Sequence, residues 1–201
     1  MNFRTAEFSL RKVKNPKALV VFIPGSGQDG RFMPNLPSLR KWADEHKCAT
    51  IGCHFEDINP QNIEGYADAK GGSGQALLDY IAKYNLEHLP IFTWGFSAGG
   101  QFSYEFACFV PNRVAGFVVN KGGFYYTALA PPETRKIPAI FFTGNKDAMF
   151  RQYIICGLYL MNKRDEQCKW ELVQEEVDHV PGDSLKLGLE LFEKVLTEKI
   201  A

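Results

Sequence analysis

A serine between two glycines is the residue of this sequence best suited to chemistry. Gly95-Phe96-Ser97-Ala98-Gly99 follows the apolar run 89–94 and precedes a stretch of helical character, 100–109. A G-x-S-x-G nucleophile elbow requires this strand–turn–helix context, because a strained turn between small residues exposes the hydroxyl. Ser97 is therefore the first candidate nucleophile. The other interpretation is a turn of small residues where a helix packs closely on a strand.

A serine hydroxyl reacts well only when a base takes its proton and a third group orients that base. In strand–turn–helix elbows the partners follow in the order serine, acid, histidine. Of the four histidines, only His179 follows Ser97. It lies on a predicted loop after the strand-like run 169–174, at the edge of the sheet where open α/β proteins place their chemistry. We therefore predict that His179 is the base, and the alternative is a solvated loop histidine.

The acid is expected between the serine and the histidine. Glu105 falls inside the helix predicted after the elbow, so it is poorly placed. Asp147 follows an apolar run of the buried-strand type, 138–143, and a glycine turn. Such a loop can hold a carboxylate beside an imidazole, so Asp147 is the predicted acid. An aspartate here also suits the N-cap of the helix expected from about residue 148, and the two roles are compatible.

Two backbone N–H groups are needed to bind the charge that develops on a carbonyl oxygen. The N–H of Ala98 lies at the start of the predicted helix, where free amides and the helix dipole favour negative charge. The second donor is expected from the glycine-rich turn after the buried strand 18–23, and we assign it to Ser26, with Gly27 as the neighbouring option. The same turn could cradle a phosphate, but it lacks the Gly-Lys-Ser/Thr ending of a nucleotide loop.

Three segments carry a resemblance to a known superfamily: Pro24-Gly25-Ser26-Gly27-Gln28, then 95–101, then 111–116. On these motifs the chain resembles the α/β-hydrolases over almost its whole length. It is most similar to the branch of polyhydroxybutyrate-depolymerase-like and feruloyl-esterase-like carboxylesterases. One departure is Pro24, because many relatives carry histidine at that place. A second is the short segment 122–136, which leaves no room for a large cap domain and predicts an open site.

Composition agrees with one enzyme domain. The chain has 201 residues, 45% of them hydrophobic, which suits a single domain over 1–201. Lysine plus arginine and aspartate plus glutamate both total 23, which gives no support for a nucleic-acid surface.

The N-terminus lacks a continuous apolar segment, so neither a signal peptide nor a membrane span is expected. The five cysteines show no C-x-x-C or zinc spacing and are expected to be free and buried, which together with the N-terminus predicts a cytoplasmic protein.

Alternating strands and helices predict an α/β fold, with a doubly wound, mostly parallel sheet and helices on both faces. A first strand over 5–13 is expected to form a hairpin at the sheet edge. The segment 59–74 is irregular and forms either a wall of the site or a surface loop. The other strands are expected over 18–23, 49–54, 90–94, 114–119, 137–143 and 169–174, and the helices over 36–46, 73–84, 98–109, 148–161 and 184–199.

Aromatic residues gather on the loops predicted to surround the serine. Residues beyond strand ends are expected to face the substrate pocket in part, where rings stack on an acyl or aryl group; core or rim positions are the alternative. These residues are Phe32, Phe124, Tyr125, Tyr126 and Phe150.

Three polar residues also lie past predicted strand ends. Lys121 could attract a carboxylated substrate, but a solvated lysine is the expected state. His54 and Asp57 could line the site, although no chemistry demands them.

These residues and the resemblance together predict a serine hydrolase that cleaves small carboxylic esters with short acyl or aryl groups. No metal or cofactor is implied, and neither nucleic acid nor a membrane is an expected partner. The oligomeric state is open. The same constellation also cleaves peptides and thioesters, and a non-catalytic binding module with this fold is the alternative from another class.

Overall fold

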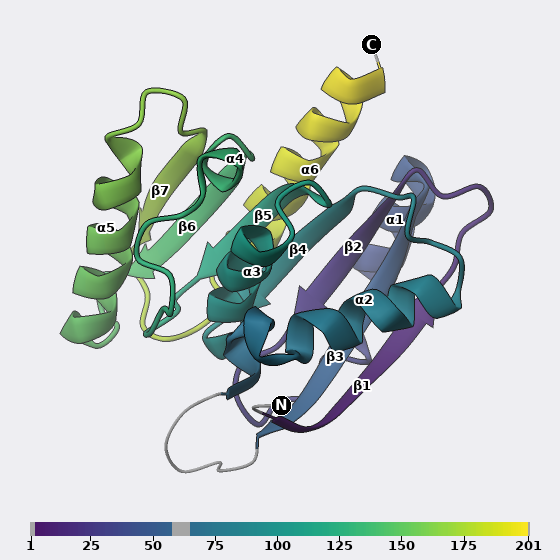
Figure 1. Cartoon of the computed structure of the whole chain (residues 1–201), viewed down its shortest axis with the longest axis horizontal. Helices are drawn as coiled ribbons and strands as arrows, with labels where there is room; N and C mark the ends of the chain where they lie inside the picture. The colour runs from purple at the N-terminus through teal and green to yellow at the C-terminus, as the bar shows by residue number, and fades with distance from the viewer. Residues whose placement is uncertain (1–2, 58–64, 201) are drawn as a thin grey trace.

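The computed structural model of the protein describes residues 3–57 and 65–200. Seven strands form one sheet in the order β1-β3-β2-β4-β5-β6-β7 (Figure 1). The inner strands are continuous apolar runs with both faces buried, as parallel strands between two helix layers require. Their bounds are β1 (Phe3–Arg11), β2 (Ala18–Ile23), β3 (Cys48–Asp57), β4 (Ile91–Phe96), β5 (Val114–Asn120), β6 (Ala139–Gly144) and β7 (Trp170–Glu175).

Helices cover both faces of this sheet, which confirms the predicted doubly wound α/β fold. Helices α2, α3 and α5 lie on one face, and α1 and α6 lie on the other (Figure 1). The helices are α1 (Pro37–His46), α2 (Ser73–Lys83), α3 (Ala98–Phe109), α4 (Pro132–Arg135), α5 (Met149–Lys163) and α6 (Ser184–Ile200), with short 3₁₀ turns η1 (Met33–Asn35), η2 (Gly65–Ala67) and η3 (Ala69–Gly71).

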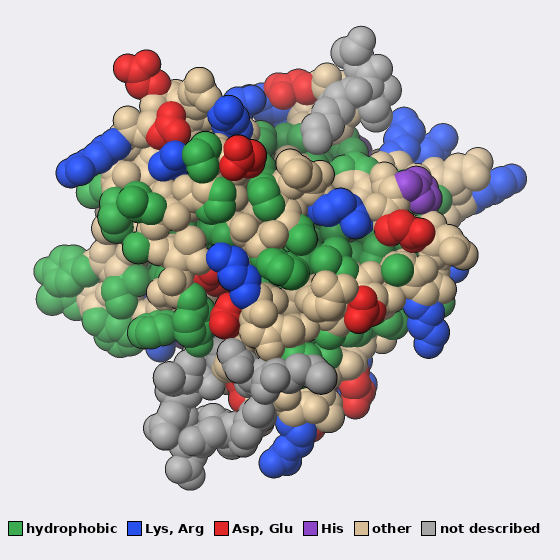
Figure 2. All heavy atoms as spheres, in the orientation of Figure 1, with side chains coloured by type: hydrophobic (Ala, Val, Ile, Leu, Met, Phe, Trp, Pro, Cys, Tyr) green, Lys and Arg blue, Asp and Glu red, His purple; other side chains and the backbone are tan. Residues whose placement is uncertain are grey.

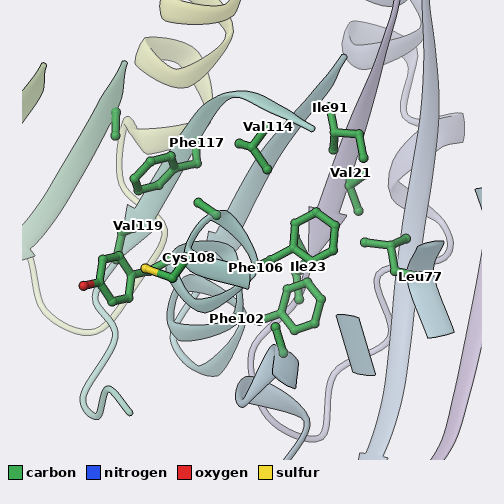
Figure 3. Packing of buried hydrophobic residues seen from close by; sticks show 14 of the residues in the cluster. Val21, Ile23, Leu77, Ile91, Phe102, Phe106, Cys108, Val114, Phe117 and Val119 are labelled. Atoms are coloured by element: carbon green, nitrogen blue, oxygen red, sulfur yellow. The ribbon is translucent and has the colours of Figure 1, made fainter. Parts of the chain in front are cut away.

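Helix α3, which follows the serine, is buried on nearly every side. Its rings Phe102 and Phe106 pack against Val21, Ile23 and Ile91 from the centre of the sheet (Figure 3). Each fully buried ring contributes about 1.5–3 kcal/mol relative to an exposed one. The turn that carries Ser97 is therefore fixed between a rigid strand and a rigid helix.

The strand β1 corrects one prediction. It does not form a hairpin with the next strand in the chain but pairs antiparallel with β3, from Phe3 opposite Asp57 to Arg11 opposite Thr50. The reason lies in β2, whose two edges are both taken, by β3 and by β4. The predicted edge position of the first strand is right, and its predicted partner is wrong.

The connection between β5 and β6 is short, as the sequence predicts. It contains only the four-residue helix α4, so no large cap covers the sheet. Buried Glu105 accepts hydrogen bonds from the main-chain N–H groups of Tyr126 and Thr127 at 2.8 Å each and from the Thr127 hydroxyl at 2.7 Å. The connection is thereby fastened to α3.

The segment predicted as irregular lies partly outside the described residues, at 59–64. Its described part forms η2, η3 and the start of α2. In residues 3–57 and 65–200, no helix combines the length and the apolar character needed to cross a bilayer.

Candidate active site

The turn between β4 and α3 holds Ser97 in a strained conformation. Its φ is +54° and its ψ is −122°, and its main-chain N–H donates to the carbonyl oxygen of Asn120 at 2.8 Å. Non-glycine residues adopt such a positive φ rarely, and they do so mostly at functional sites. A β-carbon on Gly95 would overlap the carbonyl oxygen of Gly99, and one on Gly99 would overlap that of Ile23. The turn has the geometry predicted for an elbow.

Three side chains predicted to act together do meet. The Oγ of Ser97 lies 3.0 Å from Nε2 of His179, and Nδ1 of His179 lies 2.7 Å from Oδ2 of Asp147. They come from the loops after β4, β6 and β7, which open at the same edge of the parallel sheet. Asp147 is nearly buried, with 4% of its side chain exposed, whereas 29% of the His179 side chain is exposed. The imidazole therefore joins a buried carboxylate to a hydroxyl.

The second oxygen of Asp147 is also held. Oδ1 accepts from the N–H of Ala148 at 2.6 Å, and Nε of Arg151 lies 3.6 Å away. Ala148 is the N-cap of α5, so the alternative prediction that Asp147 is the N-cap is wrong. Arg151 is a neighbour that the sequence analysis missed, although its spacing of four residues from Asp147 on a helix start would have indicated it.

The loop of His179 is fixed around the imidazole. The ring packs on Phe96, with centroids 5.0 Å apart and planes inclined by 38°. The main-chain N–H of His179 donates to Oδ1 of Asp178 at 2.7 Å. Asp178 therefore serves the backbone of the loop, whereas Asp147 is the carboxylate that contacts the ring.

The predicted oxyanion turn passes directly beside Ser97. A β-carbon on Gly25 would lie 3.3 Å from the β-carbon of Ser97. The turn is closed by Gln28, whose N–H donates to the Gly25 carbonyl and whose Oε1 accepts from the Gly25 N–H, both at 3.1 Å. Ser26 is exposed on this turn, and Ala98 is the first residue of α3, where its N–H has no acceptor within the helix.

Side chains from β3 and η2 support this turn from behind. Tyr66 donates its hydroxyl to the Pro24 carbonyl at 3.1 Å, and Nδ1 of His54 donates to the Gln28 carbonyl at 3.2 Å. Asp57 accepts from the N–H of Tyr66 at 3.1 Å. His54 and Asp57 lie inside β3 rather than past its end, because this strand runs three residues beyond its predicted limit at His54.

Lys121 contradicts its predicted solvated state. Its side chain is fully buried and forms an ion pair with Glu175, the last residue of β7. Nζ also donates to Oδ1 of Asn120 at 3.1 Å. The φ of Lys121 is +53°. The partner lies 54 residues away in the chain, so no local pattern could have indicated this pair.

An apolar cavity of about 650 Å³ lies beside these groups, on the face of the sheet that α1 and α6 cover. Phe96, the residue before the serine, and Gly182, close after the histidine, both line it. Of its aromatic walls only Phe32 was predicted from the sequence, because Phe32 lies on a loop and the others alternate along β2 and β4. Other lining residues are Phe22, Phe32, Met33, Trp94 and Leu185.

The five aromatic residues predicted for the pocket do not all lie in the same place. Phe32 lines the cavity. Phe124 and Tyr126 are exposed and contact each other edge to face, with centroids 5.4 Å apart. Tyr125 packs edge-on against buried Tyr104, and burial raises the pKa of its phenol.

Phe150 is exposed on α5, where hydrophobic side chains gather at the left edge of Figure 2. None of Phe124, Tyr125, Tyr126 and Phe150 is among the residues that line the apolar cavity. Phe124, Tyr125 and Tyr126 belong to the connection after β5, and Glu105 holds this connection against α3, away from the cavity.

No family model matches the chain, and no curated protein matches it. Solved structures do. The chain has the α/β-hydrolase fold, because structures with that fold match it over more than nine-tenths of its length.

Three of the similar structures illustrate how well the fold matches and how low the sequence identity is. A poly(3-hydroxybutyrate) depolymerase, LpqC from Bordetella parapertussis, matches with a TM-score of 0.72 at 15% identity, over 93% of this chain and 83% of that one. A phospholipase/carboxylesterase from Dyadobacter fermentans matches with a TM-score of 0.63 at 20% identity, over 94% and 97%. FphF, a fluorophosphonate-binding serine hydrolase from Staphylococcus aureus, matches with a TM-score of 0.58 at 16% identity, over 92% and 86%.

Proposed function

We propose that this protein is a serine hydrolase that cleaves carboxylic esters through an acyl-enzyme. The observation that carries the proposal is the continuous contact from Ser97 through His179 to Asp147, with distances of 3.0 and 2.7 Å. A hydroxyl, an imidazole and a buried carboxylate in this order are the parts of a nucleophilic triad. The similar structures include proteins described as esterases, which supports the class of reaction.

In the first half-reaction the Oγ of Ser97 attacks the ester carbonyl carbon, and its proton passes to Nε2 of His179. The carbonyl oxygen becomes an oxyanion, which the N–H groups of Ala98 and Ser26 bind. The imidazolium then gives the proton to the leaving alcohol oxygen as the ester bond breaks. Asp147 accepts the Nδ1 hydrogen throughout and stabilises the imidazolium charge.

In the second half-reaction a water molecule attacks the acyl carbon. His179 takes the proton of the water, the same two N–H groups bind the new oxyanion, and the proton returns to Ser97 as the acid leaves. The partly exposed imidazole gives water access to the acyl carbon. The cycle needs neither a metal nor a cofactor.

The cavity supports a neutral substrate with an apolar group. Its walls next to Ser97 are aromatic and aliphatic, and it opens to solvent without a cap. A short acyl chain or an aryl group fits this surface better than a charged one, because burying an unpaired charge is costly. We propose soluble short-acyl or aryl esters as substrates of a single-domain cytoplasmic enzyme, without activation at a lipid interface.

A fluorophosphonate probe tests the proposal. Wild-type protein is expected to be labelled once per chain, and Ser97→Ala is expected to lose labelling and to turn over p-nitrophenyl acetate about a thousandfold or more slowly. Ser38→Ala, an exchange of the same kind at an exposed position of α1, is the control and is expected to behave as wild type.

Labelling of Ser97→Ala at the wild-type level would place the nucleophile elsewhere. A folded wild type that neither binds the probe nor turns over esters would favour a binding module. Faster turnover of thioester or peptide substrates than of matched esters would keep the mechanism and change the substrate class.

A further inference from the structure

The mechanism above leaves a buried ion pair unexplained. We propose that Lys121, Glu175 and Asn120 are positioning residues that fix the imidazole of His179 relative to the hydroxyl of Ser97. The inference rests on the proposed function, but it concerns how the site is built and not which bond is cleaved. Lys121 and Glu175 do not touch the reacting groups, so they act through the loop that carries His179.

Glu175 holds the far end of that loop. Its Oε1 accepts from the main-chain N–H of Asp183 at 2.7 Å. Gly182 packs so closely that a β-carbon there would overlap both carboxylate oxygens, and its φ of +56° also favours glycine. The main-chain oxygen of Glu175 accepts from the N–H of Asn145 at 2.9 Å, which ties the loop of the acid to the same residue.

Asn120 holds the loop from the centre of the sheet. Its Nδ2 donates to the Pro181 carbonyl at 2.8 Å and to the Ser184 hydroxyl at 2.6 Å. Its main-chain oxygen accepts from the N–H of Ser97 at 2.8 Å. The end of β5 is therefore bonded to the nucleophile on one side and to the histidine loop on the other.

Lys121 completes the set by charge. Nζ pairs with Oε2 of Glu175 and donates to Oδ1 of Asn120, so one ammonium orients both side chains that hold the loop. The lysine stem passes over Gly144, where a β-carbon would lie 3.0 Å from Cε. Its positive φ is the kind of strain that persists only where the surroundings impose it.

The physical reason for a positioning role is the steepness of catalysis with distance. A displacement of about 1 Å in a reacting group costs about a hundredfold in rate. Without Lys121 the carboxylate of Glu175 is buried without a counter-charge and must take a proton or turn outwards. Either change weakens its bond to Asp183 and lets the His179 loop shift.

Four variants test the inference. Lys121→Met leaves the carboxylate unpaired, and Glu175→Gln keeps the shape and removes the charge. The double variant Lys121→Met/Glu175→Leu replaces the pair by apolar groups, an exchange that often preserves stability. Arg11→Met removes an ion pair that is more exposed, with Asp44 at 2.6 Å, from β1 at the far edge of the sheet, and it serves as the control for loss of a cation away from the site.

Two readouts separate positioning from folding. Turnover of p-nitrophenyl acetate is divided by the number of sites that a fluorophosphonate titrates, so unfolded protein does not count. The downfield proton resonance of the hydrogen bond between His179 and Asp147 reports the imidazole position without any substrate. We expect kcat per titrated site to fall about tenfold or more in the first three variants with KM within about twofold, and the resonance to shift or broaden.

Wild-type kcat per site together with an unchanged resonance in the folded double variant would overturn the inference, because the pair would then only stabilise the fold. If Lys121→Met does not fold, Glu175→Gln and the double variant give the answer. If wild-type protein hydrolyses no ester, the proposed function fails, and the resonance alone still decides whether the pair positions the imidazole.

Discussion

Gly95 and Gly99 face each other across the Ser97 turn with no space for a side chain between them. A β-carbon on Gly95 would overlap the carbonyl oxygen of Gly99, and a β-carbon on Gly99 would overlap the backbone of Ile23 in β2. Ser97 keeps its strained φ because the main chain of the turn packs directly against the main chain of α3 and β2.

Gly99→Ala is therefore expected to lower the free energy of unfolding by about 3 kcal/mol or more, because main-chain atoms cannot give way as a flexible side chain can. Gly157→Ala makes the same exchange on α5, where nothing apart from the adjacent residues and the helix's own backbone lies within 4 Å of the added carbon. It is expected to raise the free energy of unfolding by about 0.5–1 kcal/mol. Urea denaturation measures the free energy of unfolding of both variants. Equal changes in the two variants would show that the turn tolerates a side chain.

Asp147→Asn is expected to reduce turnover by up to about ten-thousandfold while the fold stays intact. The amide can still accept from the Ala148 N–H, but it favours the wrong tautomer of His179 and cannot offset the imidazolium charge. Asp178→Asn is the matched control exchange. Oδ1 of Asp178 accepts from the main-chain N–H of His179 and not from its ring, so only a small effect on turnover is expected. Kinetics with p-nitrophenyl acetate measure both, and full activity of Asp147→Asn would move the orienting role to Asp178 or Glu176.

Met33→Trp is expected to narrow the apolar cavity. Turnover of p-nitrophenyl hexanoate should then fall about tenfold or more relative to the acetate, because the longer acyl chain needs the space that the indole fills. Met161→Trp places the same ring on the exposed face of α5 and should leave the ratio unchanged. An unchanged ratio in Met33→Trp would mean that the acyl group lies outside the cavity.

Glu105→Gln is expected to change how stability depends on pH. Burial raises the pKa of this carboxyl, against the lowering effect of its bonds from Thr127 and Tyr126. The folded state then binds the proton more tightly than the unfolded chain, so this group makes the free energy of unfolding fall as pH rises through and above its ordinary pKa. A glutamine keeps the two main-chain bonds through Oε1, donates to the Thr127 hydroxyl through Nε2 where the carboxylate accepted, and does not titrate.

The advantage of Glu105→Gln over wild type should therefore grow as pH rises over the range above the ordinary glutamate pKa of about 4.3. Chemical denaturation at several pH values measures the difference, with Glu133→Gln at an exposed position as the reference. A difference that stays constant across this range would show that Glu105 does not carry the effect.

The sequence predicts the sheet and the contacts among Ser97, His179 and Asp147 because both depend on short-range patterns. The apolar runs of β2, β4 and β6 identify buried strands, and the order of serine, acid and histidine follows from where their loops open. The partner of β1 could not be predicted in this way, because it depends on which strand edge is free after β2 has been enclosed.

The surroundings of the triad were harder to predict for the same reason. Lys121 follows a strand, as a solvated lysine often does, and only the distant Glu175 makes burial favourable. The cavity walls Phe22 and Trp94 lie within strands and point to the face opposite α3, so a search of the loops passes over them. Residues that act through long-range pairs have no local signal.

The pairing of β1 with β3 has a consequence for synthesis of the chain. Strand β1 leaves the ribosome before its antiparallel partner β3, which ends only at Asp57. Until then the apolar side chains Phe8 and Leu10, which pack on the core in the finished fold, have no strand to cover them. Strand β1 is therefore made before it can be paired, so the nascent chain is open to misassociation until this outermost strand can dock on β3.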